Sequence, residues 1–170
     1  TLDVLSNGRV DFGLGRGYQE YEYAGYGKTS EAATRARVEE QIQLIKLAFT
    51  EVDFTFDGEF FKVLEPITVF PRTIQKPNPP LWIAAITPES MKYTAREGIR
   101  CMFPTRGEPE EVRLKINYLA SWCAHYGRDF SQQEPAVSRF IFCSNSEGEN
   151  ERVIEEIRWQ DRVSRATRMG

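Results

Sequence analysis

The sequence predicts an α/β fold in which helices cover a parallel sheet or a barrel. Short apolar segments typical of strands alternate with longer segments whose apolar residues recur every three or four positions, as on one face of a helix. This order of strand and helix repeats four times along the chain, which is typical of parallel sheets. With 170 residues, of which 41% are hydrophobic, the chain is long enough to bury one sizeable core.

The first residues are expected to form the end of a helix and then a strand. Residues 2–5 continue a helical pattern that Asn7 and Gly8 would terminate, because both residue types tolerate the left-handed conformation. The segment 10–14 is the first predicted strand. It leads into glycines that allow the backbone to approach a ligand or a neighbouring strand closely: Gly13, Gly15 and Gly17. Their spacing fits neither a dinucleotide-binding fingerprint nor a P-loop.

The predicted helix at 30–48 carries a cation near its amino-terminal end. Its apolar face is marked by residues that recur at steps of four, three and three: Val38, Ile42, Ile45 and Ala48. The cation, Arg35, is disfavoured at this end by the helix dipole and therefore needs a partner. Two partners remain open, namely Glu39 one helical turn later and a bound anion.

Residues 52–63 are predicted to form a β-hairpin outside the main pattern. Asp57-Gly58 is a turn dipeptide, and segments rich in phenylalanine lie on both sides of it, at 54–56 and at 60–61. A short extended piece is expected at 67–70. Prolines then punctuate the chain from 71 to 80.

The next strand of the main pattern runs directly into a helix. The apolar run at 81–86 follows two prolines and is typical of a buried strand. Thr87 or its neighbour would cap the helix, with Pro88 at the first helical position. The backbone N–H groups of Glu89, Ser90 and Met91 would then point out of the helix end, where a phosphate is favoured. The alternative is an ordinary strand-to-helix loop without a ligand.

The remaining segments continue the alternation of strand and helix. The expected elements are a helix at 90–97 that ends at Gly98, a strand at 99–103, a helix from Pro109 to Gly127, a strand at 137–143, and a final helix opened by a capping box at Ser146 and Glu149.

The composition excludes several classes of function. A net charge of −3 and a pI near 5.4 provide no basic surface for nucleic acid, and no apolar run approaches the about 20 residues of a membrane span. Neither nucleic acid nor a membrane is therefore an expected partner. Three cysteines without metal-binding spacing are expected to be reduced core residues of a cytoplasmic protein: Cys101, Cys123 and Cys143. The single histidine, His125, lies near a helix end and is expected to be neither catalytic nor a metal ligand.

Several short motifs, in a fixed order, resemble the bacterial luciferase-like flavin-dependent monooxygenase family. The resemblance extends from position 2 to about position 145. The motifs are Leu2-Asp3-x-Leu5-Ser6-x-Gly8-Arg9-Val10, the glycines at 13, 15 and 17, Glu22 and Gly27, Arg35 and Glu39, Gly58 with Phe61, Gln75-Lys76-Pro77, Pro79-Pro80, and Pro88-Glu89-Ser90 with Gly98. No single motif is decisive, but their order and spacing together are specific.

The resemblance implies a (β/α)8 TIM barrel, of which this chain would supply strands four to seven. The hairpin at 52–63 would belong to an insertion beside the barrel. The resemblance also implies that reduced FMN binds at the carboxyl ends of the strands and reacts with O2 to oxygenate a small organic substrate. A separate flavin reductase would supply the reduced FMN, and the full-length protein would form a homodimer or a heterodimer. Two alternatives stay open: an F420-dependent hydride-transfer oxidoreductase on the same barrel, and a noncatalytic flavin-binding subunit.

The resemblance also implies residues that line the flavin. Gly15 and Arg16 match positions at the end of the fourth strand beside the ring, and Arg35 matches an arginine that reaches the FMN phosphate. The histidine that luciferase uses in catalysis belongs to an earlier strand, outside this chain. The catalytic residues are therefore not identified.

Three further positions match the phosphate-binding residues after the fifth strand of the family. They are Glu89, Ser90 and Tyr93. Tyr93 departs from the small hydroxyl residue of luciferase itself, and this difference puts its contact with the phosphate in doubt.

We expect residues 1–170 to be a single partial barrel domain that is truncated at both ends. The chain has no initiator methionine, and both termini interrupt helical patterns. Alone, such a fragment is expected to be inactive and poorly soluble, because half a barrel leaves two strand edges and an apolar sheet face open.

Overall fold

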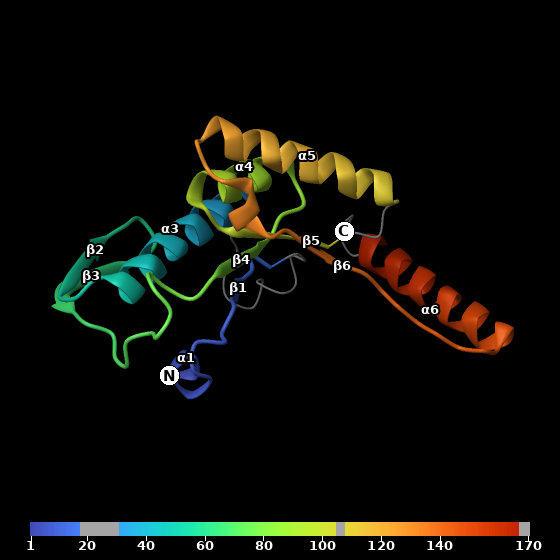
Figure 1. Ribbon diagram of the computed structural model, residues 1–170, viewed down its shortest axis with the longest axis horizontal. Coiled ribbons are helices and arrows are strands. Elements are labelled where there is room, and N and C mark those ends of the chain that lie inside the picture. Colours follow the sequence, from blue (N-terminus) through green and yellow to red (C-terminus); the bar gives the residue numbers. More distant parts are fainter. Residues whose placement is uncertain (18–30, 105–107, 167–170) are drawn as a thin grey trace. The chain divides into compact units, whose positions relative to one another are not determined.

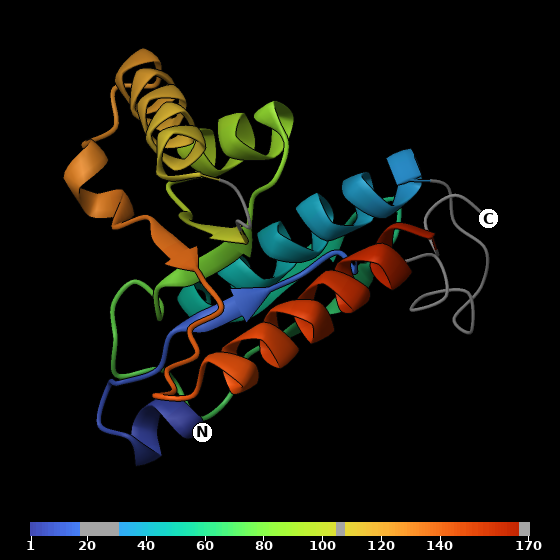
Figure 2. The same cartoon turned by 90° about the vertical axis from the view of Figure 1, so that its right-hand side faces the viewer.

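The computed structural model describes residues 1–17, 31–104 and 108–166 (Figure 1, Figure 2). The chain divides into two compact units. The first consists of Thr1–Arg16 and Ser30–Ser138, and the second of Gly17–Thr29 and Arg139–Gly170. Among the described helices, none combines the length and the apolar composition that a membrane crossing requires.

A four-stranded parallel sheet is the framework of the first unit. Its strands, in spatial order, are β1 (Phe12–Leu14), β4 (Leu81–Ala84), β5 (Arg100–Pro104) and β6 (Ala136–Ser138). Helices α3 (Glu31–Thr50), α4 (Pro88–Glu97) and α5 (Pro109–His125) lie between these strands in the sequence. The predicted α/β fold with a parallel sheet is confirmed.

The face of the sheet that is covered by helices carries the apolar core. Side chains alternate along a strand, so every second residue of β4 and β5 points toward the helices. One cluster joins β4 to α3 and α4 and consists of Ile42, Leu81, Tyr93 and Ile99. The other joins β5 to α4 and α5 and consists of Ala85, Met91, Ala95, Cys101, Phe103, Leu119 and Cys123. Helix α4 contributes to both clusters and is therefore the central helix of this layer.

The opposite face of the sheet carries a polar group at the amino-terminal ends of the strands. The Trp82 indole N–H donates a hydrogen bond of 2.9 Å to Asp11 Oδ1. The Arg100 guanidinium lies 3.6 Å from the same carboxylate oxygen, contacts the Glu134 carboxylate, and sits 5.4 Å from the centre of the Trp82 ring. These contacts tie the starts of neighbouring strands together.

The predicted hairpin is present, but its second strand begins later than expected. Strand β2 (Phe54–Asp57) pairs antiparallel with β3 (Lys62–Ile67). The connection is a four-residue loop that is closed by a 3.0 Å hydrogen bond from the Gly58 N–H to the Phe61 carbonyl. The expected strand start at Phe60 is wrong, and residues 68–70 are not part of a strand.

A carboxylate from α3 explains the shape of this loop. Glu40 accepts hydrogen bonds from the N–H groups of Glu59, Phe60 and Phe61, at 2.9, 2.9 and 2.7 Å. A Cβ atom at Gly58 would lie 2.1 Å from Glu40 Oε1. A side chain at this position would displace the Glu40 carboxylate from the loop. The N–H groups of residues 60 and 61 are bound to this carboxylate and are therefore not available for pairing with β2.

The helix α1 (Leu2–Leu5) is fastened to a distant loop by a buried carboxylate. Asp3 is 4% exposed and accepts hydrogen bonds from the Ile74 and Gln75 backbone N–H groups and from Gln75 Nε2. The bond from the Gln75 side chain is the main reason why the pKa of Asp3 is lowered. As predicted, the helix is followed by left-handed residues at Asn7 and Gly8.

The short helix η1 (Phe130–Gln133), which precedes β6, was not predicted. The predicted strand at 137–143 is too long, since β6 ends at Ser138 and the apolar side chains of residues 140–142 are exposed. In the second unit, α6 (Glu147–Ala166) begins after Ser146, as the capping box predicted. Cys143 is exposed, so its expected place in the core is wrong.

Candidate functional site

The carboxyl edge of the parallel sheet is the candidate site. In barrels of alternating strands and helices, active sites lie at this edge, because the loops that leave all the strands meet there. In the first unit, β1 leads to Gly15 and Arg16, and β4 leads to the loop before α4. Five of the six predicted site residues belong to parts of the chain that lie at this edge. These parts are the end of β1 and the amino-terminal ends of α3 and α4.

Packing against the described residues does not explain the glycine at position 15. A Cβ atom built at Gly13 or Gly15 would meet no atom of the described part of the chain within 4 Å. A glycine with open space beside it allows a flat ligand to approach the backbone, which is what the prediction for Gly15 requires. Arg16, the next residue, is half-buried and takes part in an interaction within the chain.

The first turn of α4 is closed by a capping box. Thr87 is the N-cap, with φ −100° and ψ 156°, and Pro88 follows at the start of the helix, as predicted. The Ser90 N–H donates to Thr87 Oγ1 at 3.3 Å, while Ser90 Oγ accepts from the Thr87 N–H at 3.0 Å. The Ser90 hydroxyl also donates to the Thr87 carbonyl at 2.8 Å. The chain thus satisfies these donors locally.

The expectation of three unpaired amides at this helix end is therefore wrong. The Ser90 N–H is capped by Thr87, and the Met91 N–H donates to the Thr87 carbonyl at 3.1 Å. The backbone N–H of Glu89 interacts with the carboxylate of its own side chain. A ligand at this position would have to displace these local bonds, whereas the positive end of the helix dipole remains available to it.

Glu89 feels the charge of Arg35 although the two residues lie on different helices. The pKa of Glu89 is lowered first by its own backbone N–H, then by the Thr87 side chain, and least by the positive charge of Arg35. These three effects favour the ionised form of Glu89. The alternative partner of Arg35, Glu39, also faces α4, where its carboxylate lies 4.0 Å from the Arg96 guanidinium.

Tyr93 lies apart from the other predicted phosphate ligands. Its ring is 8% exposed and packs in the cluster between α3 and α4, with the Arg96 guanidinium 5.2 Å from the ring centre. Burial raises the pKa of Tyr93 well above its usual range, and the carboxylates of Glu97 and Glu39 raise it further. The Arg96 charge and the Gln43 side chain lower this pKa, yet the Tyr93 hydroxyl makes no hydrogen bond of good geometry within the described residues. The hydroxyl thus faces α3 and not the first turn of α4.

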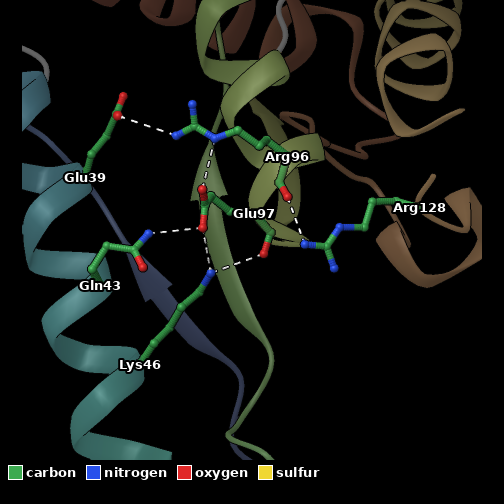
Figure 3. Close-up of polar contacts among 6 residues, drawn as sticks. All are labelled: Glu39, Gln43, Lys46, Arg96, Glu97 and Arg128. Atoms are coloured by element: carbon green, nitrogen blue, oxygen red, sulfur yellow. Dashed lines mark hydrogen bonds and ion pairs between the residues drawn. The ribbon is translucent and has the colours of Figure 1, made fainter. Parts of the chain in front are cut away.

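Sequence reasoning missed a polar cluster at the other end of α4 (Figure 3). We call it the Glu97 cluster and define it as Glu39, Gln43, Lys46, Arg96, Glu97 and Arg128. The Glu97 carboxylate accepts hydrogen bonds from Gln43 Nε2 at 3.0 Å, from Lys46 Nζ at 3.1 Å and from Arg96 Nε at 3.0 Å. Gln43 and Lys46 are three positions apart on α3, which is the only sequence signal that they share a face.

Comparison with known proteins identifies the family. A sequence profile described as luciferase-like monooxygenase matches residues 1–168. The chain belongs to this family. The predicted family and the predicted fold are both confirmed, and the four parallel strands are part of a luciferase-like (β/α)8 barrel.

Relatives within the luciferase-like family use different cofactors. The chain is 29% identical over 157 residues to the oxygenase component of a flavin-dependent trigonelline monooxygenase from Acinetobacter baylyi, covering 91% of the chain and 43% of the relative. It is 36% identical over 99 residues to an F420-dependent glucose-6-phosphate dehydrogenase from Kineococcus radiotolerans, covering 58% and 28%. Both flavin-dependent and F420-dependent enzymes are thus similar to this luciferase-like chain.

A solved structure supports the same fold. The crystal structure of monooxygenase RslO1 from Streptomyces bottropensis superposes with a TM-score of 0.81 and 25% identity, covering 98% of this chain and 51% of that one. The luciferase-like chain spans about half the length of the curated relatives that it matches, 47% and 43% for two of them.

Proposed function

We propose that this chain is the flavin-phosphate half of an FMN-dependent luciferase-like monooxygenase. The observation that carries the proposal is that Arg35 lies near the amino-terminal end of α3 and that its charge acts on Glu89, in the first turn of α4 at the carboxyl edge of the sheet. A cation beside a helix amino terminus is suited to a phosphate dianion. The bound flavin, supplied in its reduced form by a separate flavin reductase, would provide the chemistry that activates O2 and oxygenates a small organic substrate.

The described residues fit a phosphate in charge and in donor type. Arg35 supplies the counter-charge, and the Ser90 hydroxyl can turn its O–H from the Thr87 carbonyl toward a phosphate oxygen. The Glu89 carboxylate would repel a dianion unless it points away or remains paired with Arg35. The positive charge of Arg35 lowers the pKa of Glu89, though less than the backbone N–H of Glu89 and the Thr87 side chain do.

The end of β1 is proposed to lie beside the flavin ring. Gly15 has space at its Cα, so that a planar ring can approach the backbone. Arg16 follows at the same strand end. In this proposal, the two residues orient the ring and exclude water from its reactive edge, while Arg35 holds the phosphate.

The whole protein is proposed to complete the barrel around this part. Residues 1–170 would be one partial domain, and the missing strands would supply the substrate loops and the catalytic residues. A homodimer or a heterodimer is proposed for the full-length protein. The relative named as an oxygenase component supports the proposed flavin reductase partner.

An F420-dependent oxidoreductase is the second candidate, because an F420-dependent dehydrogenase is among the relatives. The complete protein should be assayed with FMN and a flavin reductase under O2, and in parallel with reduced and oxidised F420. The proposal expects substrate-dependent oxygen uptake with FMN and no turnover with F420. Turnover with F420 alone would establish the second candidate, and FMN binding without oxygen uptake would favour a noncatalytic flavin-binding subunit.

A further inference from the structure

Side chains join helices α3 and α4 in the apolar core and at the carboxyl-terminal end of α4. Near the sheet's carboxyl edge, the charge of Arg35 acts on Glu89. Halfway down, Ile42 of α3 and Tyr93 of α4 belong to one buried cluster. At the far end of α4, side chains from the middle and the last turns of α3 reach Glu97. Packing and hydrogen bonds therefore join α3 to the middle and to the carboxyl-terminal end of α4, whereas Arg35 acts on the first turn of α4 through its charge.

The Glu97 cluster is a partly buried hydrogen-bond network and not an isolated ion pair on the surface. The Glu97 side chain is 18% exposed and receives three charged or polar donors from two helices. Burial alone would raise the pKa of Glu97, but the hydrogen bonds from Gln43, Lys46 and Arg96 outweigh it and the pKa is lowered. Several donors converging on one partly buried carboxylate fix its position more firmly than a single exposed ion pair.

Backbone carbonyls at the end of α4 also accept hydrogen bonds from side chains of other elements. Lys46 Nζ donates to the Glu97 carbonyl at 3.2 Å, and Arg128 donates to the Arg96 carbonyl at 2.9 Å (Figure 3). Gly98 ends the helix in the left-handed conformation with φ 66°. Carbonyls in the last turn of a helix have no partner within the helix, so these donors satisfy groups that would otherwise depend on water.

We infer that the Glu97 cluster fixes the position of α4 along α3, and through it the placement of the first turn of α4 beside Arg35. Lys46 and Gln43 are then positioning residues for the flavin phosphate, although they lie at the opposite end of α4 from it. This inference rests on the proposed function. A helix transmits a shift along its axis because its backbone hydrogen bonds keep the rise at about 1.5 Å per residue. A slide of α4 by one residue would change the distance between Arg35 and Glu89 by a comparable amount.

The first test measures the register of the two helices, that is, the position of α4 along α3, and it needs no ligand. The carboxyl group of Glu89 is followed by ¹³C NMR during a pH titration of the complete protein, and its signal is assigned with Glu89→Gln. The pKa of Glu89 is lowered mainly by its own backbone N–H and by Thr87, which belong to the same turn, and also by Arg35 of the other helix. Lys46→Met should therefore raise that pKa toward its value in Arg35→Ala. Glu97→Gln is the second variant, since it keeps an oxygen acceptor and is milder for folding. An unchanged pKa of Glu89 in both folded variants would overturn the inference.

The second test asks whether the register matters for the phosphate. Dissociation constants of FMN and riboflavin are compared, since only FMN carries a phosphate. Lys46→Met should weaken FMN binding about three- to tenfold, the loss expected for one misplaced hydrogen-bonding group, and change riboflavin binding less than about twofold. Adding Lys46→Met to Arg35→Ala should cause no further loss, because the positioned group is already absent.

A matched control separates this effect from a general loss of charge. Lys62 forms an exposed ion pair with Asp57 at 2.8 Å in the hairpin, so Lys62→Met makes the same substitution away from the cluster and should change neither measurement. Equal weakening of both ligands by Lys46→Met would overturn the positioning role. If Arg35→Ala weakens the binding of FMN and of riboflavin equally, or weakens neither, the proposed function fails. The titration of Glu89 then still shows whether the Glu97 cluster fixes the position of α4 along α3.

Discussion

The two ends of α4 are held in different ways. At its amino-terminal end, the main contacts are local: Thr87 and Ser90 cap each other within the first turn. At its carboxyl-terminal end, Glu97 and the last carbonyls are held by side chains that are distant in the sequence, including Lys46. One end can exchange its local bonds for a ligand, and the other cannot do so without releasing a neighbouring helix.

This difference agrees with the division of labour in barrels of this type. The carboxyl edge of the sheet carries function, and the opposite edge carries stability. The Glu97 cluster lies at the stabilising edge, together with the contacts of Arg100 on the other face of the sheet. Changes at the two ends of α4 should therefore affect different properties of the protein.

The largest effect on stability is expected at the Glu97 cluster. Glu97→Ala removes the acceptor for three donors and leaves Lys46 without its carboxylate. The free energy of unfolding should fall by about 2 kcal/mol, a typical loss for hydrogen bonds to a charged group. Urea unfolding of the complete protein measures it. Glu155→Ala, which breaks an exposed pair with Arg158 on another helix, should change stability little, and an equal loss in both variants would contradict the special role of Glu97.

A smaller effect is expected at the amino-terminal end of α4. Thr87→Val keeps the shape of the side chain but removes the oxygen that accepts from the Ser90 N–H. The loss of this cap should cost about 1 kcal/mol in the free energy of unfolding. Thr55→Val, at an exposed position of β2, serves as the control. A cost at Thr87 as large as that at Glu97 would remove the contrast between the two ends.

The smallest and most specific effect is a pH dependence. Because the pKa of Glu97 is lowered from its ordinary value of 4.5, folding favours the ionised carboxylate, which stabilises the protein above that value. The difference in unfolding free energy between the parent protein and Glu97→Gln should thus be present at pH 7 and diminish as the pH falls below 4.5. The two proteins have the same other carboxyl groups, so the contributions of those groups cancel in this difference. A difference that stays constant down to pH 3 would show that the charge of Glu97 is irrelevant.

The sequence predicted those features that depend on local chemistry. Thr87, Pro88 and Gly98 bound α4 as expected, because caps and left-handed glycines act on the residues beside them. The parallel arrangement of the sheet followed from the alternation of strand and helix patterns, since parallel neighbours require crossovers. The resemblance to the family placed Arg35 at the flavin phosphate together with Glu89 and Ser90, and the charge of Arg35 acts on Glu89; their role in phosphate binding stays a prediction.

Contacts between distant residues could not be predicted. Lys46 and Glu97 are 51 positions apart, and Asp3 meets the Gln75 side chain across 72 positions. Each of these side chains has the composition of an ordinary surface residue, so its partner depends on the packing of whole elements. The amides of the first turn of α4 were expected to be unpaired for a different reason: their partner Thr87 is local, but the Ser90 hydroxyl was expected to bind a ligand.

The central claim is that Arg35 and the first turn of α4 hold the phosphate of FMN. The most direct measurement compares the binding of FMN and riboflavin to the complete protein and to Arg35→Ala. FMN binding should weaken roughly ten- to a hundredfold, the loss of one charge-assisted hydrogen bond, while riboflavin binding should barely change. Arg37→Ala, on the same helix but facing the Phe61 ring of the hairpin, should alter neither affinity. If Arg35→Ala weakens both ligands equally, or neither, the phosphate assignment is wrong and pairing of Arg35 with Glu39 becomes the better explanation.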